Sequence, residues 1–83
     1  MRTMIFKSTK ENYRKESLGL KRNTVREFDD SEDQRKRICD EFIEGKITDI
    51  NIKILNRDDI GGESFTEDIK DITKWGKLYI LSW

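Results

Sequence analysis

The sequence predicts one small domain of the α+β class, a curved sheet or β-barrel of about five strands with two helices. The chain has 83 residues, which is the length of a single domain spanning residues 1–83. Its apolar content consists mainly of eleven isoleucines and eight aromatic residues, and such side chains favour strands. The spacing of these residues indicates the order β-α-β-α-β-β-β.

The N-terminal quarter predicts a strand followed by a helix. Met4 to Phe6 is a short apolar run suited to a first strand. Ser8 or Thr9 is a side chain of the type that caps a helix, which we expect over Lys10 to Leu18. Gly19 ends this helix, because glycine readily adopts the left-handed conformation that follows a helix C-terminus.

The middle of the chain predicts a second strand and a second helix. The strand is expected over Asn23 to Phe28. The pattern Ser31-x-x-Gln34 is a capping box, so a helix is expected to begin there and to end at Gly45. Its apolar stripe includes Cys39, which we expect to be buried, since free cysteine is among the most buried residue types.

The C-terminal part predicts three strands. Ile50 to Ile54 alternates isoleucine with polar residues, as a half-buried strand does. Asp58 to Glu63 contains two glycines and is expected to be a loop. Phe65 to Ile72 is expected to be one strand with a bulge or bend, because its apolar residues change phase. Leu78 to Trp83 is apolar on both faces, which predicts a central or doubly covered strand.

The composition excludes several classes of protein. There is no histidine and only one cysteine, which excludes histidine acid–base catalysis and an internal disulfide and leaves little scope for zinc. No stretch approaches the roughly 20 apolar residues of a membrane span. The N-terminus lacks the apolar run of a secretory signal. We therefore expect a cytoplasmic protein that acts away from membranes and without a cofactor or metal.

The formal net charge is zero, yet the charges are unevenly distributed along the chain. Residues 1–26 hold eight basic and two acidic residues, a net charge of +6, and the remainder carries −6. This asymmetry can produce a basic face that attracts anionic partners. In the alternative interpretation, the two halves neutralise one another across the fold.

The basic turn from Gly19 to Arg26 is the densest candidate site. Lys21 and Arg22 supply positive charge, Thr24 a hydroxyl, and Arg26 a planar fork of donors suited to an anion or a base. The alternative is a solvated turn without a ligand, in which Arg26 pairs with an acidic neighbour such as Glu27 or Asp71.

The pattern Gly-x-Lys-x-x-Thr-x-Arg, formed by Gly19, Lys21, Thr24 and Arg26, resembles the signature of the ASCH domains. These are small PUA-like β-barrels associated with RNA or modified-nucleoside recognition. The preceding strand and helix, and the closing residues 79–83, are also similar to that group. The resemblance covers about the first third of the chain and the final strand, and it implies a PUA-like fold.

The resemblance also implies a possible activity. Some small bacterial members of the ASCH group are amidohydrolases that act on N4-acetylcytidine through a lysine, a threonine and a glutamate. Lys21 and Thr24 match the first two of these catalytic residues. For the glutamate, Glu63 and Glu67 are candidates by position only.

Three functions therefore stay open. The first is a nucleic-acid or nucleotide-binding module, related to RNA, that uses Lys21, Arg22, Thr24 and Arg26. Trp75 or Tyr79 would stack a base in it, although core packing is the alternative role for Trp75 and Trp83. The second is the amidohydrolase. The third is a phage-like or mobile-element product that inhibits a host protein through the acidic stretch Glu27 to Asp33 and the helix behind it.

Overall fold

The computed structural model describes residues 2–59 and 61–83, and within them it places two helices and six strands. The helices are α1 (Lys10–Ser17) and α2 (Gln34–Ile43). The strands are β1 (Arg2–Ser8), β2 (Asn23–Glu27), β3 (Ile50–Asn56), β4 (Ser64–Asp68), β5 (Asp71–Trp75) and β6 (Leu78–Ser82). The predicted α+β class and the two helices are confirmed. Ile60, in the predicted loop, lies outside the described residues.

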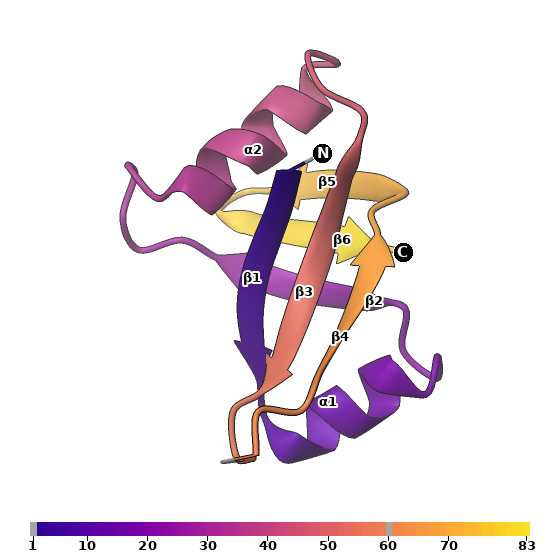
Figure 1. Cartoon of the computed structure of the whole chain (residues 1–83). Helices are drawn as coiled ribbons and strands as arrows, with labels where there is room; N and C mark the ends of the chain where they lie inside the picture. The colour runs from indigo at the N-terminus through magenta and orange to yellow at the C-terminus, as the bar shows by residue number, and fades with distance from the viewer. Residues whose placement is uncertain (1, 60) are drawn as a thin grey trace.

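The strands form two three-stranded sheets. The first has the order β1-β3-β4, with β1 parallel to β3, and the second has the antiparallel order β2-β6-β5. Figure 1 shows the strands of the first sheet running across those of the second, with α2 near one end of the first sheet and α1 near the other. In the described residues the two sheets are separate layers and do not close into the barrel that was one of the expected forms.

The predicted strand from Phe65 to Ile72 is instead two strands, β4 and β5, which belong to different sheets. The chain turns between them, where the backbone N–H of Ile69 donates to Ile50 O at 3.0 Å and that of Lys70 donates to Ser82 O at 2.8 Å. Ile69 and Ile72 are both buried although three positions separate them. A straight strand would place them on opposite faces, so the change of phase marks the corner.

The capping residues of α1 agree with the prediction. Thr9 is its N-cap, and the Thr9 hydroxyl accepts a hydrogen bond from the backbone N–H of Asn12 at 3.3 Å. Gly19 follows the helix with a φ of 75°, in the left-handed region. Its N–H donates to Glu16 O and the N–H of Leu20 donates to Lys15 O, so the glycine turn closes the helix after Ser17.

The predicted capping box of α2 is wrong. The N-cap is Asp33 rather than Ser31, and the helix begins at Gln34. The Asp33 carboxylate accepts from the backbone N–H of Arg35 at 2.9 Å and also from the Arg35 guanidinium at 2.7 Å. An aspartate held by two such contacts satisfies the helix N-terminus better than a serine hydroxyl two residues earlier. The predicted end at Gly45, with a φ of 78°, is confirmed.

The core lies between the two sheets and is filled mainly by β1, β3 and β6. The buried hydrophobic residues are Met4, Phe6, Tyr13, Cys39, Ile50, Ile52, Ile54, Ile69, Ile72, Tyr79, Leu81 and Trp83. The alternation of β3 and the central place of β6, between β2 and β5, confirm the predictions for those segments. Cys39 is fully buried, as expected, and burial raises its pKa to about 12.

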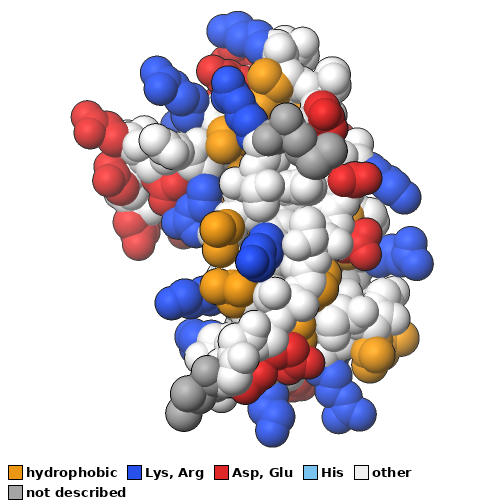
Figure 2. Space-filling model, viewed as in Figure 1, with side chains coloured by type: hydrophobic (Ala, Val, Ile, Leu, Met, Phe, Trp, Pro, Cys, Tyr) orange, Lys and Arg blue, Asp and Glu red, His pale blue; other side chains and the backbone are white. Residues whose placement is uncertain are grey.

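Charges of both signs lie on the surface. On the face in Figure 2, basic and acidic side chains are interspersed, while acidic ones gather at the left over the loop between β2 and α2. In that loop Asp29, Asp30 and Glu32 are exposed. No helix in the described part of the chain is long and apolar enough to cross a membrane.

Candidate functional site

A polar pocket opens where the end of β1, helix α1 and the start of β2 meet, and we call it the Glu16 pocket. Its volume is about 250 Å³. It is lined by Lys7, Ser8, Thr9, Asn12, Glu16, Lys21, Thr24, Val25, Arg26 and Arg57. Three of the four predicted ligand-binding residues are therefore brought together at one hollow.

Arg26 holds the frame of this pocket. Its Nε donates to Thr24 Oγ1, its Nη1 to the backbone oxygen of Lys7 and its Nη2 to Ser8 Oγ, each at 2.9 Å. The guanidinium also lies over the Phe6 ring, 4.9 Å from its centroid. These contacts join β2 to β1, so Arg26 is a supporting residue rather than the freely available fork that the sequence predicted.

The contacts of Arg26 leave two hydroxyl groups available to a ligand. Thr24 and Ser8 are 4% and 5% exposed, and each oxygen accepts a hydrogen bond from Arg26. A hydroxyl that accepts at its oxygen still has its own proton to donate. Thr24 in particular is fixed on β2 by its pairing with Leu81. The pocket thus contains hydroxyl donors of fixed position.

Glu16 is the most unusual residue of the pocket. It is 2% exposed, and neither of its carboxylate oxygens has a hydrogen-bond partner. Among the described residues these two oxygens are the only buried side-chain polar atoms without one. Burying an ion without a partner costs several kcal/mol. Such a group at the wall of a pocket is therefore positioned for a ligand that donates hydrogen bonds.

The charge of Glu16 acts on Arg26. Burial lowers the pKa of Arg26, the negative charge of Glu16 raises it, and the positive charge of Arg35 lowers it. The net direction is downward, because burial has the largest effect. No ion pair joins Glu16 to Arg26 in the described structure, so the carboxylate acts on this cation through its charge and not through a direct contact.

The mouth of the pocket carries positive charge. Lys21 is half-buried and is placed by the glycine turn, where its backbone N–H donates to Lys15 O at 3.1 Å. Lys7 and Arg57 are exposed, and the backbone N–H of Arg57 donates to Ser8 O at 2.8 Å. The pocket therefore combines a cationic entrance with one buried carboxylate.

Arg22 is the predicted site residue that does not reach the pocket. Its side chain is exposed and lies beside Gly19, on the outside of the turn. Its backbone oxygen accepts from the N–H of Trp83 at 3.0 Å, which ties the turn to the C-terminal end of the second sheet. Arg22 thus contributes to the shape of the turn.

The aromatic residues predicted to stack a base lie elsewhere. Tyr79 is 2% exposed, and its hydroxyl donates to Asp40 at 2.7 Å, so both faces and the polar end are occupied. Trp83 is buried against Phe65, with ring centroids 6.0 Å apart, as its core-packing interpretation expects. Trp75 is 77% exposed at the end of β5, so it is not a core residue and could contact a partner, but it does not line the Glu16 pocket.

The carboxylate of this pocket was not anticipated. Neither Glu63 nor Glu67 lines it; Glu63 accepts from Asn56 at 3.4 Å, and Glu67 is exposed on β4. A sequence signal for Glu16 does exist: it lies three residues after Tyr13, on the helix face that Tyr13 turns to the core. A charged residue at such a position is a candidate functional group.

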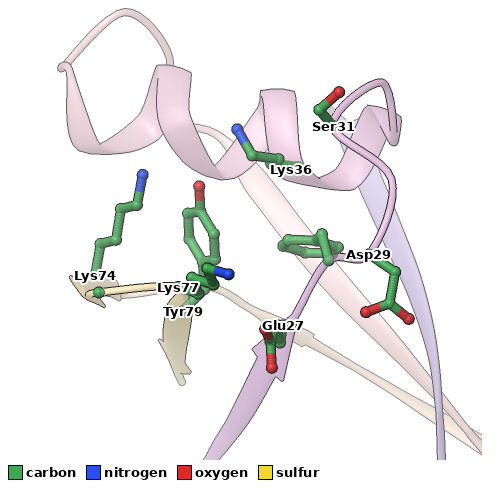
Figure 3. A pocket seen from close by; sticks show the side chains of 9 residues that line it. Glu27, Asp29, Ser31, Lys36, Lys74, Lys77 and Tyr79 are labelled. Carbon is green, nitrogen blue, oxygen red and sulfur yellow. The ribbon is translucent and has the colours of Figure 1, made fainter.

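A second pocket lies between α2 and the ends of β2 and β6, with a volume of about 360 Å³. In Figure 3 the Tyr79 hydroxyl points toward α2, with Lys74 on one side and Lys36 on the other. Asp40 accepts from Tyr79 at 2.7 Å and from Lys36 at 3.0 Å, and Lys74 lies 4.0 Å from it. The polar groups beside this second pocket are thus paired with one another, whereas the carboxylate oxygens of Glu16 have no partner.

The pairings proposed for a solvated turn are also absent. In residues 2–59 and 61–83, Arg26 forms no ion pair with Glu27 or Asp71. The same residues contain no cluster of three or more aspartate, glutamate, histidine or cysteine side chains placed to hold a metal ion.

The relation of this chain to the ASCH domains depends on the residues of one turn. Gly19, Lys21, Thr24 and Arg26 carry the resemblance, and the structure places the last three at one pocket. Comparison with known proteins adds no further support, since no family model, no curated protein and no solved structure matches the chain. Membership of that group therefore stays a prediction.

Proposed function

We propose that the Glu16 pocket binds a nucleotide, either free or as an exposed nucleotide of RNA. One observation carries the proposal: a buried carboxylate with two unpartnered oxygens faces a pocket whose mouth is cationic. A nucleotide has the matching polarity, because its phosphate is anionic and its base offers N–H donors. The base would lie against Glu16, and the phosphate would lie at the mouth.

The entrance supplies the charge that a phosphate requires. Three cationic residues from separate parts of the chain line the pocket: Lys7 of β1, Lys21 of the turn after α1, and Arg57 of the loop after β3. Lysine and arginine are the usual phosphate-binding residues. Arg57 lies 3.7 Å from Asp58 in an exposed pair, which contributes little and does not prevent an anion from binding.

The size of the pocket favours one base. A volume of about 250 Å³ is below the range of roughly 300–1,000 Å³ typical of pockets for drug-sized ligands. One base with its phosphate outside would occupy it. Recognition of single unstacked bases is common among proteins that bind single-stranded RNA.

Binding of single-stranded RNA tests the proposal. A random-sequence oligonucleotide, titrated calorimetrically at about 50 mM and about 200 mM salt, is expected to bind and to weaken as salt rises. Lys21→Ala is expected to weaken binding and to reduce the salt slope by about 0.7, the contribution of one phosphate contact to a single strand.

Lys77→Ala is the matched control, because Lys77 lines the second pocket and the substitution removes the same charge. It should leave binding close to that of the unmodified protein. Binding to RNA is wrong if the oligonucleotide does not bind at low salt, and the role of Lys21 at the mouth is wrong if the two lysine variants bind equally. Arg26→Ala is a poor probe because it would also remove the contacts between β1 and β2.

Amide hydrolysis is a second candidate function. The observation that favours it is that Lys21, Thr24 and a carboxylate, Glu16, line the same pocket. These are the three residue types that the ASCH resemblance implies for hydrolysis of N4-acetylcytidine. In that reaction water adds to the acetyl carbonyl, the C–N bond breaks, and cytidine and acetate form.

Incubation with N4-acetylcytidine, followed by chromatography, tests this candidate. Cytidine and acetate should appear in equal amounts, and Thr24→Val should lower the rate by about 100-fold or more if the hydroxyl takes part in proton transfer. Absence of deacetylation by the unmodified protein would reject hydrolysis while leaving nucleotide binding unaffected.

A further inference from the structure

We infer that the base recognised by the Glu16 pocket is guanine. The inference rests on the proposed function and deepens it by naming the base. Its basis is the pair of oxygens of Glu16, both of which are buried, lie at the pocket and have no partner. A carboxylate in this condition selects a ligand that donates two hydrogen bonds side by side.

Only guanine among the four RNA bases offers that arrangement on its Watson–Crick edge. Its N1–H and its N2 amino group are adjacent donors pointing in the same direction. Adenine and cytosine each place a ring-nitrogen acceptor beside their amino group, and uracil places carbonyl oxygens on both sides of its single N–H. Each of these three bases would turn at least one lone pair toward Glu16 and leave an oxygen unpaired.

The rest of the pocket fits the other polar atom of that edge. Guanine O6 lies next to N1 and accepts hydrogen bonds. Thr24 has a hydroxyl whose oxygen already accepts from Arg26, which leaves its proton to donate, and Lys21 has an ammonium group at the same pocket. A donor set beside a carboxylate therefore complements the acceptor–donor–donor order of guanine.

Within the described residues, no protein group occupies the carboxylate of Glu16 and competes with a ligand for it. Arg26 directs its three bonded nitrogens to Thr24, Lys7 and Ser8. No lysine or arginine of the described chain forms an ion pair with Glu16. The carboxylate thus lines the pocket, lies close enough to Arg26 to act on its pKa, and has no hydrogen-bond or ion-pair partner among the described residues.

The test compares four nucleotides on the unmodified protein. GMP, IMP, AMP and CMP are titrated separately by calorimetry, and GMP is expected to bind about tenfold or more tightly than AMP and CMP. IMP keeps N1–H and lacks the 2-amino group, so its affinity is expected to lie between those of GMP and AMP. This comparison needs no variant and cannot be confused with a folding defect.

The variant Glu16→Gln then tests whether Glu16 causes the preference for GMP. The amide offers one acceptor and one donor, so GMP should bind this variant no more tightly than AMP does. Glu11→Gln, at an exposed position of the same helix, is the control and should keep the preference.

Two oligonucleotides, one of adenosines only and one with a single central guanosine, show whether the base comes from RNA or from a free nucleotide. RNA is indicated if the oligonucleotide with guanosine binds more tightly than GMP, and a free nucleotide is indicated if it binds more weakly.

The outcomes separate the two proposals. If nucleotides bind but GMP shows no preference over AMP, or IMP equals GMP, guanine recognition is wrong and nucleotide binding stands. If Glu16→Gln keeps the preference for GMP, Glu16 is not the recognition residue and the inference is overturned. If neither a nucleotide nor an oligonucleotide binds, the proposed function fails, and the inference fails with it.

Discussion

At the scale of the residue, Glu16 is a buried carboxylate without a hydrogen-bond partner, and we expect it to lower the stability of the fold. It lies on the helix face that packs inward, where an apolar side chain would bury surface without an unpaired charge. The surrounding residues shape a hollow beside it and do not neutralise it by contact. A residue that lowers stability at a pocket is typical of sites where function and stability compete.

We therefore expect Glu16→Gln to stabilise the protein in the absence of ligand. Gln has nearly the same shape but carries no charge, so the desolvation cost falls by about 1 kcal/mol or more. For a domain of this size that difference raises Tm by about 4–8 °C. Thermal unfolding followed by circular dichroism measures it. Glu11→Gln should change stability by less than about 0.5 kcal/mol because Glu11 is exposed. A lower Tm for Glu16→Gln would show that the carboxylate has a stabilising partner.

At the scale of elements, β1 has an edge that is covered by side chains rather than by another strand. Arg26 donates to the backbone oxygen of Lys7 and Arg35 donates to that of Ile5, at 2.9 and 3.0 Å. Both guanidinium groups also lie over the Phe6 ring, 4.9 and 4.7 Å from its centroid. Unpaired carbonyl groups on an edge strand invite pairing with other chains, and these contacts occupy two of them.

Arg35 also couples the start of α2 to pH. The hydrogen bond from its side chain holds the pKa of Asp33 below the ordinary value of 3.8. A lowered pKa in the folded state contributes stability that is present above about pH 4 and is lost as pH falls through the folded pKa. Asp33→Asn removes this contribution, so its stability should decline less steeply than that of the unmodified protein between about pH 4 and pH 2.

Urea unfolding at a series of pH values measures the two slopes. Arg35→Ala should flatten the curve in the same way, because the contact needs both partners. The double variant should then be no flatter than either single variant. Equal slopes for Asp33→Asn and the unmodified protein would show that another carboxylate dominates acid unfolding. Asp40 is the alternative: burial raises its pKa, but hydrogen bonds from Tyr79 and Lys36 outweigh that effect and lower it.

At the scale of the whole molecule, the elements defined by local signals were predictable from the sequence. Thr9 and Gly19 mark the ends of α1, and the isoleucines of β3 alternate as a strand requires. The division of residues 64–75 between two sheets was not predictable, because the corner at Ile69 is fixed by hydrogen bonds to distant strands. The place of Glu16 next to Tyr13 marked it as a residue of the inner helix face, but its burial depends on the packing of α1 against β1 and β3, which the sequence of α1 does not contain.

The two-layer core predicts unequal effects for two isoleucines on neighbouring strands. Ile52 of β3 is fully buried between the sheets, and Ile5 of β1 is 51% exposed on the outer face. Ile52→Ala should lower the free energy of unfolding by about 2–5 kcal/mol, through lost burial and the cavity left behind. Ile5→Ala should cost less than about 1 kcal/mol. Denaturant unfolding measures both, and similar losses would contradict the assignment of the inner face.

The pairing of β2 with β6 alone has a consequence for the order in which the protein assembles. Val25, at the middle of β2, pairs with Ile80, which is close to the C-terminal end of the chain. Strand β1 likewise pairs only with β3, which follows it by about forty residues. Contacts between such distant segments form slowly, because long loops have to close first. During synthesis, the Glu16 pocket can therefore take its final shape only after β6 has emerged from the ribosome, although nine of the ten residues that line it are made in the first third of the chain.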